Sequence, residues 1–311
     1  MYVRRRRETD GRTGGSKAEC RDHCQSACRG ARGEETVMQV VEPYAQLLAY
    51  QFDDDFIPDV EDDFRFPVFN PADGPRALRR CELFGRVSHR AEGAITVDSW
   101  RNFIQRWTLE HGDWSFIEHV SLSADLVVDR GITHEIVRHR IAAYTQESTR
   151  FVNYGKKGGE IKCVLPPPLE PVHALMEKHR GNSYGPSTVA NMIMEAELVG
   201  YADANKFARW YLHWMDGARA AEGRYLEQLK MGVAPQYARD ELPHKVASRI
   251  ISTYDLRTWR HTFLMRTTAE AHPKYRRVYI PLLADFKQCV PLLFDDIEPL
   301  AKQSDNLKKM R

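Results

Sequence analysis

The chain has 311 residues, of which 42% are apolar, and its formal net charge is +2 at pH 7. This length suits one large or two ordinary domains with a substantial core. Since the sequence has no run of about 18 apolar residues, we expect no membrane span, and its nearly balanced charge argues against duplex nucleic acid as the main partner.

The first 37 residues are expected to form a flexible tail. They contain four consecutive arginines, Arg4 to Arg7, but almost no large apolar side chains, so they cannot bury enough surface to offset the entropy of ordering. A nucleic-acid-binding arm is the alternative, and six acidic residues in the same stretch argue against it. Because no apolar segment follows the arginines, we expect no secretory signal and a cytoplasmic protein.

The six cysteines are expected to be reduced thiols, since no secretory signal is expected. Three of them, Cys20, Cys24 and Cys28, lie close together near His23 and suggest a metal site. Zinc sites usually combine two pairs of ligands at characteristic spacings, and a second pair is missing. We therefore expect free thiols and no metal there.

In the first half of the chain, a helix is expected to begin at Trp100, because Asp98 or Ser99 can cap it. Residues 119–126 alternate between polar and apolar side chains, which predicts a half-buried strand. A short helix running through Arg138 is expected to follow.

The second half of the chain predicts a strand near 161–165, helices over about 187–201 and 202–230, a strand near 246–252, and helices near 256–267 and 274–290. Strands and helices therefore interleave along the sequence. This order predicts an α/β or α+β fold in which a mixed sheet packs against helices.

The segment from Arg138 to Arg150 has the densest set of candidate binding residues. Arg138, His139 and Arg140 are consecutive, and Ser148 and Arg150 follow. The planar fork of arginine matches phosphate or carboxylate oxygens two at a time. A basic helix end favoured by the macrodipole is the simpler explanation, but it does not account for the polar run after Arg140. We interpret the segment as a site for an anionic, phosphorylated ligand.

Three further blocks accompany this segment: Trp114 to His119, Ala238-Arg239 with Leu242-Pro243, and Asp255-Leu256-Arg257 followed by His261 and Arg266. Together with Arg-His-Arg, Ser-x-Arg and the following Phe151, they resemble the flavin-dependent thymidylate synthase family. The four blocks occur in the family's order and at compatible spacing over roughly residues 80–290.

The resemblance implies an enzyme that transfers a methylene group from methylenetetrahydrofolate to C5 of a uridylate. In the family, reduced FAD supplies the hydride and NADPH recharges the flavin. Residues 38–311 would then be a single catalytic domain with the family fold, a mixed sheet packed with helices. The resemblance also implies a homotetramer whose flavin sites lie between subunits.

Particular roles follow from the same resemblance. Arg266 would be catalytic, because a cation near the uracil ring stabilises the negative charge that develops there. The implied cofactor-binding residues are Ser115, Arg138, His139, Arg140, Gln146, Asp255, Arg257 and His261. The implied substrate-binding residues are Glu135, Arg138, Gln146, Glu147, Ser148, Thr149, Arg150, Arg239 and Arg266.

The sequence departs from the family's common pattern at three positions in two of these blocks. Gln146 stands where a glutamate is common, Asp255 where an asparagine is common, and Phe151 where a tyrosine is frequent. An aspartate only accepts hydrogen bonds, whereas an asparagine also donates them. The nucleotide thus stays open between dUMP, which is the default, and UMP in a pathway such as nucleoside-antibiotic biosynthesis.

The sequence also contains features of two other classes of protein. His134 and His139 flank Glu135 in a pattern similar to a zinc-protease motif, but their spacing of five residues rotates the second histidine about 140° from the first. We therefore expect no metal. A non-catalytic nucleic-acid-binding protein that uses the arginine-rich segments is the remaining alternative.

Overall fold

The computed structural model describes residues 38–47, 74–156, 161–180 and 182–309. The expected tail, Cys20, Cys24, Cys28 and the aspartate-rich stretch at 53–63 lie outside these ranges. No helix in the described part is long and apolar enough to cross a membrane.

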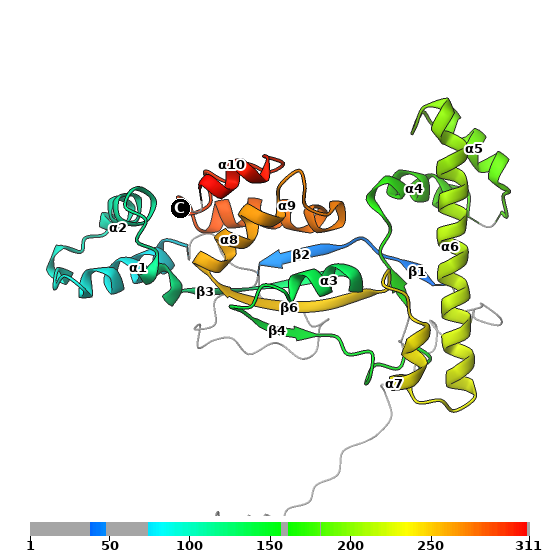
Figure 1. Cartoon of the computed structure of the whole chain (residues 1–311), viewed down its shortest axis with the longest axis horizontal. Coiled ribbons are helices and arrows are strands. Elements are labelled where there is room, and N and C mark those ends of the chain that lie inside the picture. The colour runs from blue at the N-terminus through cyan, green and yellow to red at the C-terminus, as the bar shows by residue number, and fades with distance from the viewer. Residues whose placement is uncertain (1–37, 48–73, 157–160, 181, 310–311) are drawn as a thin grey trace, which may run out of the picture. The chain divides into compact units, whose positions relative to one another are not determined.

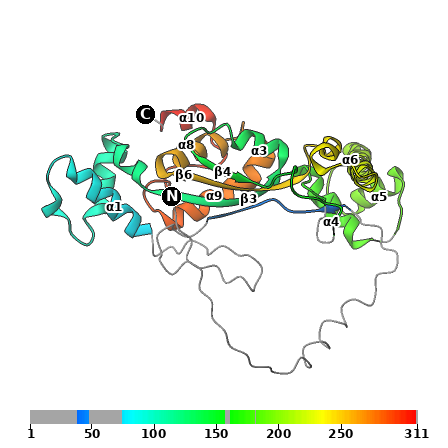
Figure 2. The same cartoon turned by 90° about the horizontal axis from the view of Figure 1, so that it is seen from below.

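The main sheet has four antiparallel strands in the order β2-β3-β6-β4 (Figure 1). Its strands are β2 (Tyr44–Leu47), β3 (Ser121–Asp129), β4 (Ala143–Gln146) and β6 (Ala247–Asp255). β3 and β6 pair along their whole length, with Ser121 opposite Asp255 and Asp129 opposite Ala247; Figure 2 shows them running side by side. A second, two-stranded parallel sheet joins β1 (Gln39–Val40) to β5 (Lys162–Cys163).

Both central strands lead directly into helices. β3 is followed by α3 (Arg130–Ile136), and β6 by α8 (Leu256–Arg266). In each case the strand's last residue caps the helix: Asp129 accepts from the N–H of Ile132, and Asp255 accepts from the N–H of Thr258. A carboxylate at this position satisfies one of the free N–H groups of the first turn.

One face of the main sheet is covered by α8 and α9 (Pro273–Cys289) (Figure 1). The alternation of β6 explains this, because every second residue from Ser248 to Tyr254 is buried and the others are half-buried. Trp259 and Phe263 of α8 pack against Phe286 of α9 in this core, the first at a tilted angle and the second edge to face. The core also receives α1 (Gly74–Val87) and a helix that begins as α2 (Ser99–Phe103) and continues with π-helical geometry through Ile104–Glu110.

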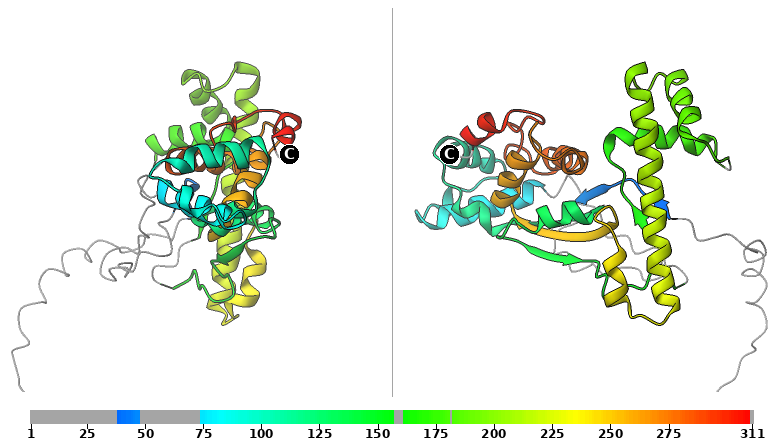
Figure 3. Two further views of the ribbon diagram at one scale, coloured as in Figure 1. Left: turned by 90° about the vertical axis from the view of Figure 1, so that its left-hand side faces the viewer. Right: turned by 45° about the vertical axis from the view of Figure 1, so that its right-hand side comes forward.

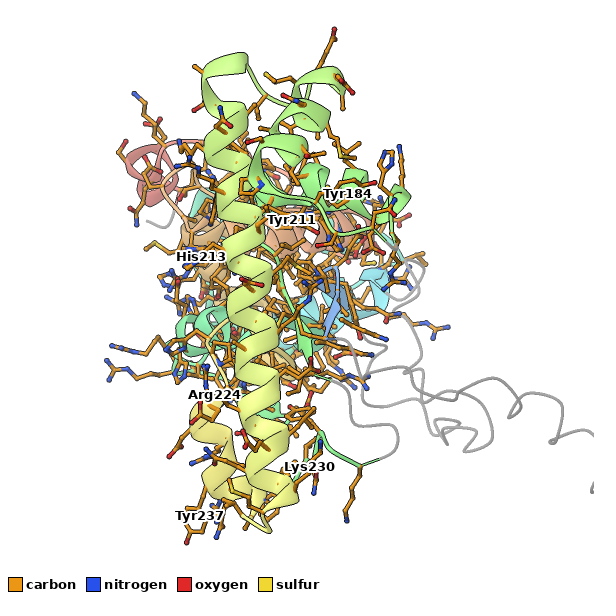
Figure 4. All side chains as sticks on the ribbon, turned by 90° about the vertical axis from the view of Figure 1, so that its right-hand side faces the viewer. Tyr184, Tyr211, His213, Arg224, Lys230 and Tyr237 are labelled. Atoms are coloured by element: carbon orange, nitrogen blue, oxygen red, sulfur yellow. The ribbon has the colours of Figure 1, made fainter. Side chains whose placement is uncertain are left out.

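A second hydrophobic cluster is built around α6 (Tyr201–Lys230), a helix of 30 residues. It packs with α4 (Glu170–Lys178) and α5 (Pro186–Glu195), as Figure 3 shows. Tyr211 belongs to the buried side of α6, whereas His213 and Arg224 are exposed (Figure 4). The short helix α7 (Pro235–Ala238) follows α6, and α10 (Gln303–Lys308) packs on α8.

The structure confirms the predicted α/β class and most predicted elements, with some corrections. Neither predicted cap residue of the helix near Trp100 uses its side chain as a cap; the hydroxyl of Ser99 instead accepts from the N–H of Thr96 and donates to Glu82. The strand expected at 161–165 is only two residues long. β4, which lies inside the arginine-rich segment, was not predicted. Neither were β1, β2, α1, α4, α7 and α10.

Candidate active site

The arginine-rich segment folds as a turn followed by a strand. After α3 ends at Ile136, residues 137–142 form the turn that contains Arg138, His139 and Arg140, and β4 then pairs with β6. The start of α3 is fixed by Asp129, which caps the helix and also forms an ion pair with Lys274 of α9. The turn is therefore held between the sheet and the helices that cover it.

The centre of the site is a contact between this turn and the end of α8, 127 residues further along the chain. Nε of Arg266 donates to Nε2 of His139 at 3.2 Å, and Nη1 of Arg266 donates to Oε2 of Glu135 at 3.0 Å. An arginine N–H can only donate, so Nε2 of His139 accepts and the ring proton of the neutral imidazole lies on Nδ1. Nη2 of Arg266 makes no hydrogen bond to any residue in the described ranges, which leaves two N–H groups for a ligand.

Electrostatics keep His139 neutral. Burial, the charge of Arg266 and the neighbouring His261 together lower the pKa of His139 to about 4, and burial contributes most. Burial and the charge of Arg257 also lower the pKa of His261, whose ring meets that of His139 at 6.5 Å between centroids. Near neutral pH, Arg266 is therefore the cation of this centre, and Glu135 is its partly exposed counter-ion.

Gln146 is held in one orientation by its neighbours. Its Nε2 donates to the hydroxyls of Thr133 and Ser248, both at 3.0 Å. The Thr133 hydroxyl donates its own proton to the carbonyl of Arg130, so it accepts from Gln146 and thereby fixes the amide. Oε1 of Gln146 makes no hydrogen bond to a residue of the described ranges.

The residues after Gln146 form a turn around Ser148. Its hydroxyl accepts from the N–H of Arg150, and its carbonyl accepts from the N–H groups of Phe151 and Val152. Thr149 is buried, whereas the guanidinium of Arg150 is exposed and lies 5.5 Å from the centroid of the Phe151 ring.

The side chain of Glu147 is hydrogen-bonded within the chain. Its Oε1 accepts from the hydroxyl of Tyr154 at 2.6 Å, and burial together with this carboxylate raises the pKa of Tyr154. Its backbone N–H remains bonded to the carbonyl of Arg249. The side chain of Glu147 thus stabilises the turn.

Besides Arg150 and Arg257, three predicted arginines are exposed: Arg138, Arg140 and Arg239. Arg239 begins a short 3₁₀ turn, Arg239–Glu241, which is tied to α6 by the ion pair between Glu241 and Arg224. No hydrogen bond or ion pair joins the guanidinium of any of the three to another residue of the described chain. Their geometry is compatible with binding an anionic ligand from outside, but no contact brings Arg239 to the other predicted residues.

The predicted cofactor residues outside the arginine-rich segment gather at the start of α8. Arg257 and His261 line a hollow together with Trp114, which precedes Ser115 in the chain. The Ser115 hydroxyl donates to Asp113 at 2.8 Å, and Arg257 forms an ion pair with Glu118. Both carboxylate oxygens of Asp255 accept from Thr258, one from its N–H and one from its hydroxyl, so this side chain already has a capping role.

The two histidines of the zinc-protease-like pattern, His134 and His139, have different partners in the structure. The ring of His134 lies against His244 at 5.9 Å, while His139 contacts Arg266. Within the described ranges, no group of three histidine, cysteine or carboxylate side chains is arranged to hold a metal.

Sequence reasoning missed a set of tyrosines at this centre. Tyr144 lies inside the arginine-rich segment and bonds the turn through its hydroxyl, and Tyr275 of α9 lies 4.8 Å from the Arg266 guanidinium. The position of Tyr144 between Arg140 and Ser148 was the only signal available. Tyr275 had none, because it comes from a distant helix.

Comparison with known proteins agrees with this architecture. The model of the family described as thymidylate synthase complementing protein matches residues 72–292. A flavin-dependent thymidylate synthase of Mycobacterium sp. (strain JLS) is 31% identical over 239 residues, which cover 76% of this chain and 85% of that protein. One of Mycobacterium marinum is 28% identical over 238 residues, covering 75% and 83%, and one of Mycolicibacterium vanbaalenii is 31% identical over 234 residues, also covering 75% and 83%.

The fold, the site and these relatives define the chain as an enzyme of the methyltransferase class. It belongs to the flavin-dependent thymidylate synthase family.

Proposed function

We propose that this enzyme methylates C5 of dUMP to form dTMP, with methylenetetrahydrofolate as the one-carbon donor, FAD as the flavin and NADPH as the reductant. The observation that supports it most is the meeting of Arg266 with His139 of the arginine-rich turn, which leaves Nη2 of Arg266 available. The family membership supports the reaction type.

The donor set fits a flavin dinucleotide. Its pyrophosphate and ring carbonyls require fixed cations and N–H donors. Arg138 and Arg140 offer exposed guanidinium groups on the turn, while Arg257 and His261 line the hollow beside Trp114. The remaining proposed flavin contacts are Ser115, His139, Gln146 and Asp255. When bound, the flavin supplies the hydride that completes the methyl group.

The proposed nucleotide contacts surround the same turn. Arg150 would bind the phosphate, with Ser148 and Thr149 supporting its turn and Arg239 as a further cation. Oε1 of Gln146 would accept from the ligand as the family's common glutamate does, because both amide protons are bonded within the protein. Glu135 and Arg138 complete this set, and Glu147 acts through its turn.

In the proposed reaction, Arg266 stabilises negative charge on the uracil ring. C5 of uracil is a poor nucleophile until electron density builds on the ring, and a fixed cation near N3–O4 or O2 favours that state. Glu135 and His139 hold the guanidinium in one orientation before the substrate arrives. Because His139 is neutral at neutral pH, it orients Arg266 without adding a competing positive charge.

UMP remains the alternative substrate. Discrimination between the two sugars depends on one hydroxyl, and a site that hydrogen-bonds it rejects the analogue strongly, whereas a roomy site accepts both. Because Gln146 is oriented so that Oε1 is its remaining acceptor, it can replace the family's common glutamate in accepting a hydrogen bond. This residue therefore gives little reason to depart from the family's default substrate, dUMP.

We further propose that residues 38–311 act as one catalytic domain in a cytoplasmic homotetramer whose flavin sites lie between subunits. The exposure of Arg138 and Arg140 supports this assembly, because a neighbouring subunit would complete a site that one chain leaves open. A non-catalytic nucleic-acid-binding protein is the competing class.

Flavin loading separates these classes. The purified protein, incubated with FAD and desalted, should keep a flavin absorbance spectrum and show a tetrameric mass by light scattering. A variant carrying His139→Ala with Arg140→Ala should lose the flavin. The matched control, Arg209→Ala with His213→Ala on the exposed side of α6, should retain it. Wild-type protein that stays colourless after loading would overturn the flavoenzyme assignment.

A further inference from the structure

A group of four tyrosines, three of them buried and Tyr144 half-buried, lies next to the contact between Arg266 and His139. Its members come from three elements: Tyr144 of β4, Tyr254 of β6, and Tyr275 and Tyr279 of α9. Tyr254, Tyr275 and Tyr279 are at most 1% exposed. Burial raises the pKa of all four phenols, so each side chain is neutral. The hydroxyls of Tyr275 and Tyr279 have no hydrogen-bond partner in the described part of the chain, so these two residues act through their rings.

Tyr144 connects this group to the arginine-rich turn. Its hydroxyl lies 2.9 Å from the carbonyl oxygen of Ile136 and 2.6 Å from that of His139, and 3.1 Å from the hydroxyl of Tyr254. A phenol has one proton to donate, so Tyr144 shares it between the two carbonyls and accepts from Tyr254. The last carbonyl of α3 and that of His139 are thereby fixed to the same point.

Tyr254 places this contact in the core. Its ring meets that of Tyr144 edge to face at 5.9 Å and lies 4.3 Å from Trp259 of α8. It also lies 6.4 Å from the ring of His139. Since Trp259 donates from its indole N–H to the carbonyl of Leu122 at 2.9 Å, the position of Tyr254 is set by both central strands and α8.

Tyr275 supports the other half of the contact. The centroid of its ring lies 4.8 Å from the guanidinium carbon of Arg266 and 4.4 Å from the ring of Tyr279. The face of an aromatic ring attracts a cation, and the attraction is strongest where water is excluded. Tyr275 is fully buried, so it presents a rigid face to Arg266.

We propose that Tyr144 and Tyr275 are positioning residues for this reaction: Tyr144 fixes the turn that carries Arg138, His139 and Arg140, and Tyr275 fixes the guanidinium of Arg266. The inference rests on the proposed function, in which the turn binds the flavin and Arg266 acts on the uracil. It assigns separate effects to the two tyrosines. Loss of the Tyr144 hydroxyl should loosen the flavin, and loss of the Tyr275 ring should slow the chemical step.

The test compares Tyr144→Phe, Tyr275→Leu and Tyr275→Phe in the full chain. Tyr144→Phe should raise the dissociation constant for FAD about tenfold, because it leaves the carbonyl of His139 without its donor and the carbonyl of Ile136 with the N–H of His139 alone. Tyr275→Leu should lower kcat about tenfold or more with little change in the KM for dUMP. Tyr275→Phe keeps the ring face and should stay within about twofold of wild type in kcat.

Tyr211→Phe is the matched control. Tyr211 is also a buried tyrosine with a bonded hydroxyl, in this case to His173 at 2.9 Å, but it belongs to the cluster around α6. The thermal midpoint of Tyr211→Phe should fall by about as much as that of Tyr144→Phe, whereas its FAD affinity and kcat should remain at the wild-type values. If Tyr275→Leu does not fold, Tyr144→Phe, which removes one oxygen atom, decides the matter.

Two results would overturn the inference. FAD affinity of Tyr144→Phe and kcat of Tyr275→Leu both within twofold of wild type would show that the tyrosines only fill the core. Equal losses of kcat in Tyr275→Phe and Tyr275→Leu would show that the aromatic ring of Tyr275 does not position Arg266. Failure of the proposed function is distinguishable, because wild-type protein itself would then bind no FAD or leave dUMP unmethylated.

Discussion

At the scale of single residues, Arg266 and His139 form a pair whose two members have different tasks. Arg266 is the cation, with one edge bonded to Glu135 and His139 and with Nη2 left for a ligand. His139 is neutral because burial and Arg266 lower its pKa to about 4. A charged histidine here would repel Arg266 and could no longer accept its hydrogen bond.

Replacing Arg266 by alanine should slow methylation much more than it weakens flavin binding. Removing one donor that stabilises developing charge typically lowers the rate by about 10²–10³-fold. Steady-state rates and FAD titrations measure the two effects separately. Arg276→Ala is the control, since Arg276 is a half-buried arginine of α9 whose guanidinium is bonded, within the described ranges, to the carbonyl of Ala269. Rates of Arg266→Ala within a few-fold of wild type would assign catalysis to another residue.

The lowered pKa of His139 also predicts how stability depends on pH. The unfolded chain binds a proton at histidine near its ordinary pKa of about 6.5, whereas the folded protein binds it only near 4. Stability contributed by neutral His139 is therefore complete above pH 6.5 and is lost as the pH falls toward 4. The free energy of unfolding should fall less steeply over this window in His139→Gln than in wild type. Identical slopes from chemical denaturation would contradict the lowered pKa.

At the scale of elements, the site depends on two strand-to-helix junctions with the same chemistry. Asp129 and Asp255 each end a central strand and cap the helix that follows. Because β3 and β6 are antiparallel, the two helices begin at opposite ends of the strand pair. α3 brings in the arginine-rich turn, and α8 runs back so that its last residue, Arg266, meets that turn.

Substitutions of Asp255 test whether its carboxylate is needed as the cap of α8. Asp255→Ala should destabilise the protein by about 1 kcal/mol, the usual effect of losing such a cap. Asp255→Asn restores the family's common residue and keeps a capping oxygen, so its stability should stay within about 0.5 kcal/mol of wild type. Thermal or urea unfolding of both variants measures this difference. An equal loss in the two variants would show that charge, rather than capping, is what α8 requires.

The helices and strands differ in how well the sequence predicts them. Long periodic segments such as α6, α9 and β6 were predicted close to their observed bounds, because their apolar spacing reflects burial on one side. β4 was missed, since Ala143–Gln146 has only four residues and becomes a strand by pairing with β6. The candidate site was predicted largely from the family resemblance, whereas Tyr144 and Tyr275 depend on contacts between distant segments that no local pattern encodes.

At the scale of the whole molecule, one core carries the site and a second surrounds α6. Residues that the sequence separates by more than 100 positions meet at the turn after α3. The arginines of that turn, Arg138 and Arg140, are exposed, and in the proposed function they bind the flavin. The proposed tetramer would enclose them.

The most direct test of the central claim is a methylation assay with FAD, NADPH and methylenetetrahydrofolate, in which dUMP and UMP carry tritium at C5. Methylation at C5 releases that hydrogen to water, so tritium release counts each turnover. We predict flavin-dependent release from dUMP, much slower release from UMP, and a large loss of both with Arg266→Ala. Faster release from UMP would replace dUMP by the ribonucleotide as substrate. No release from either nucleotide by the flavin-loaded protein would contradict the proposed uridylate methylation.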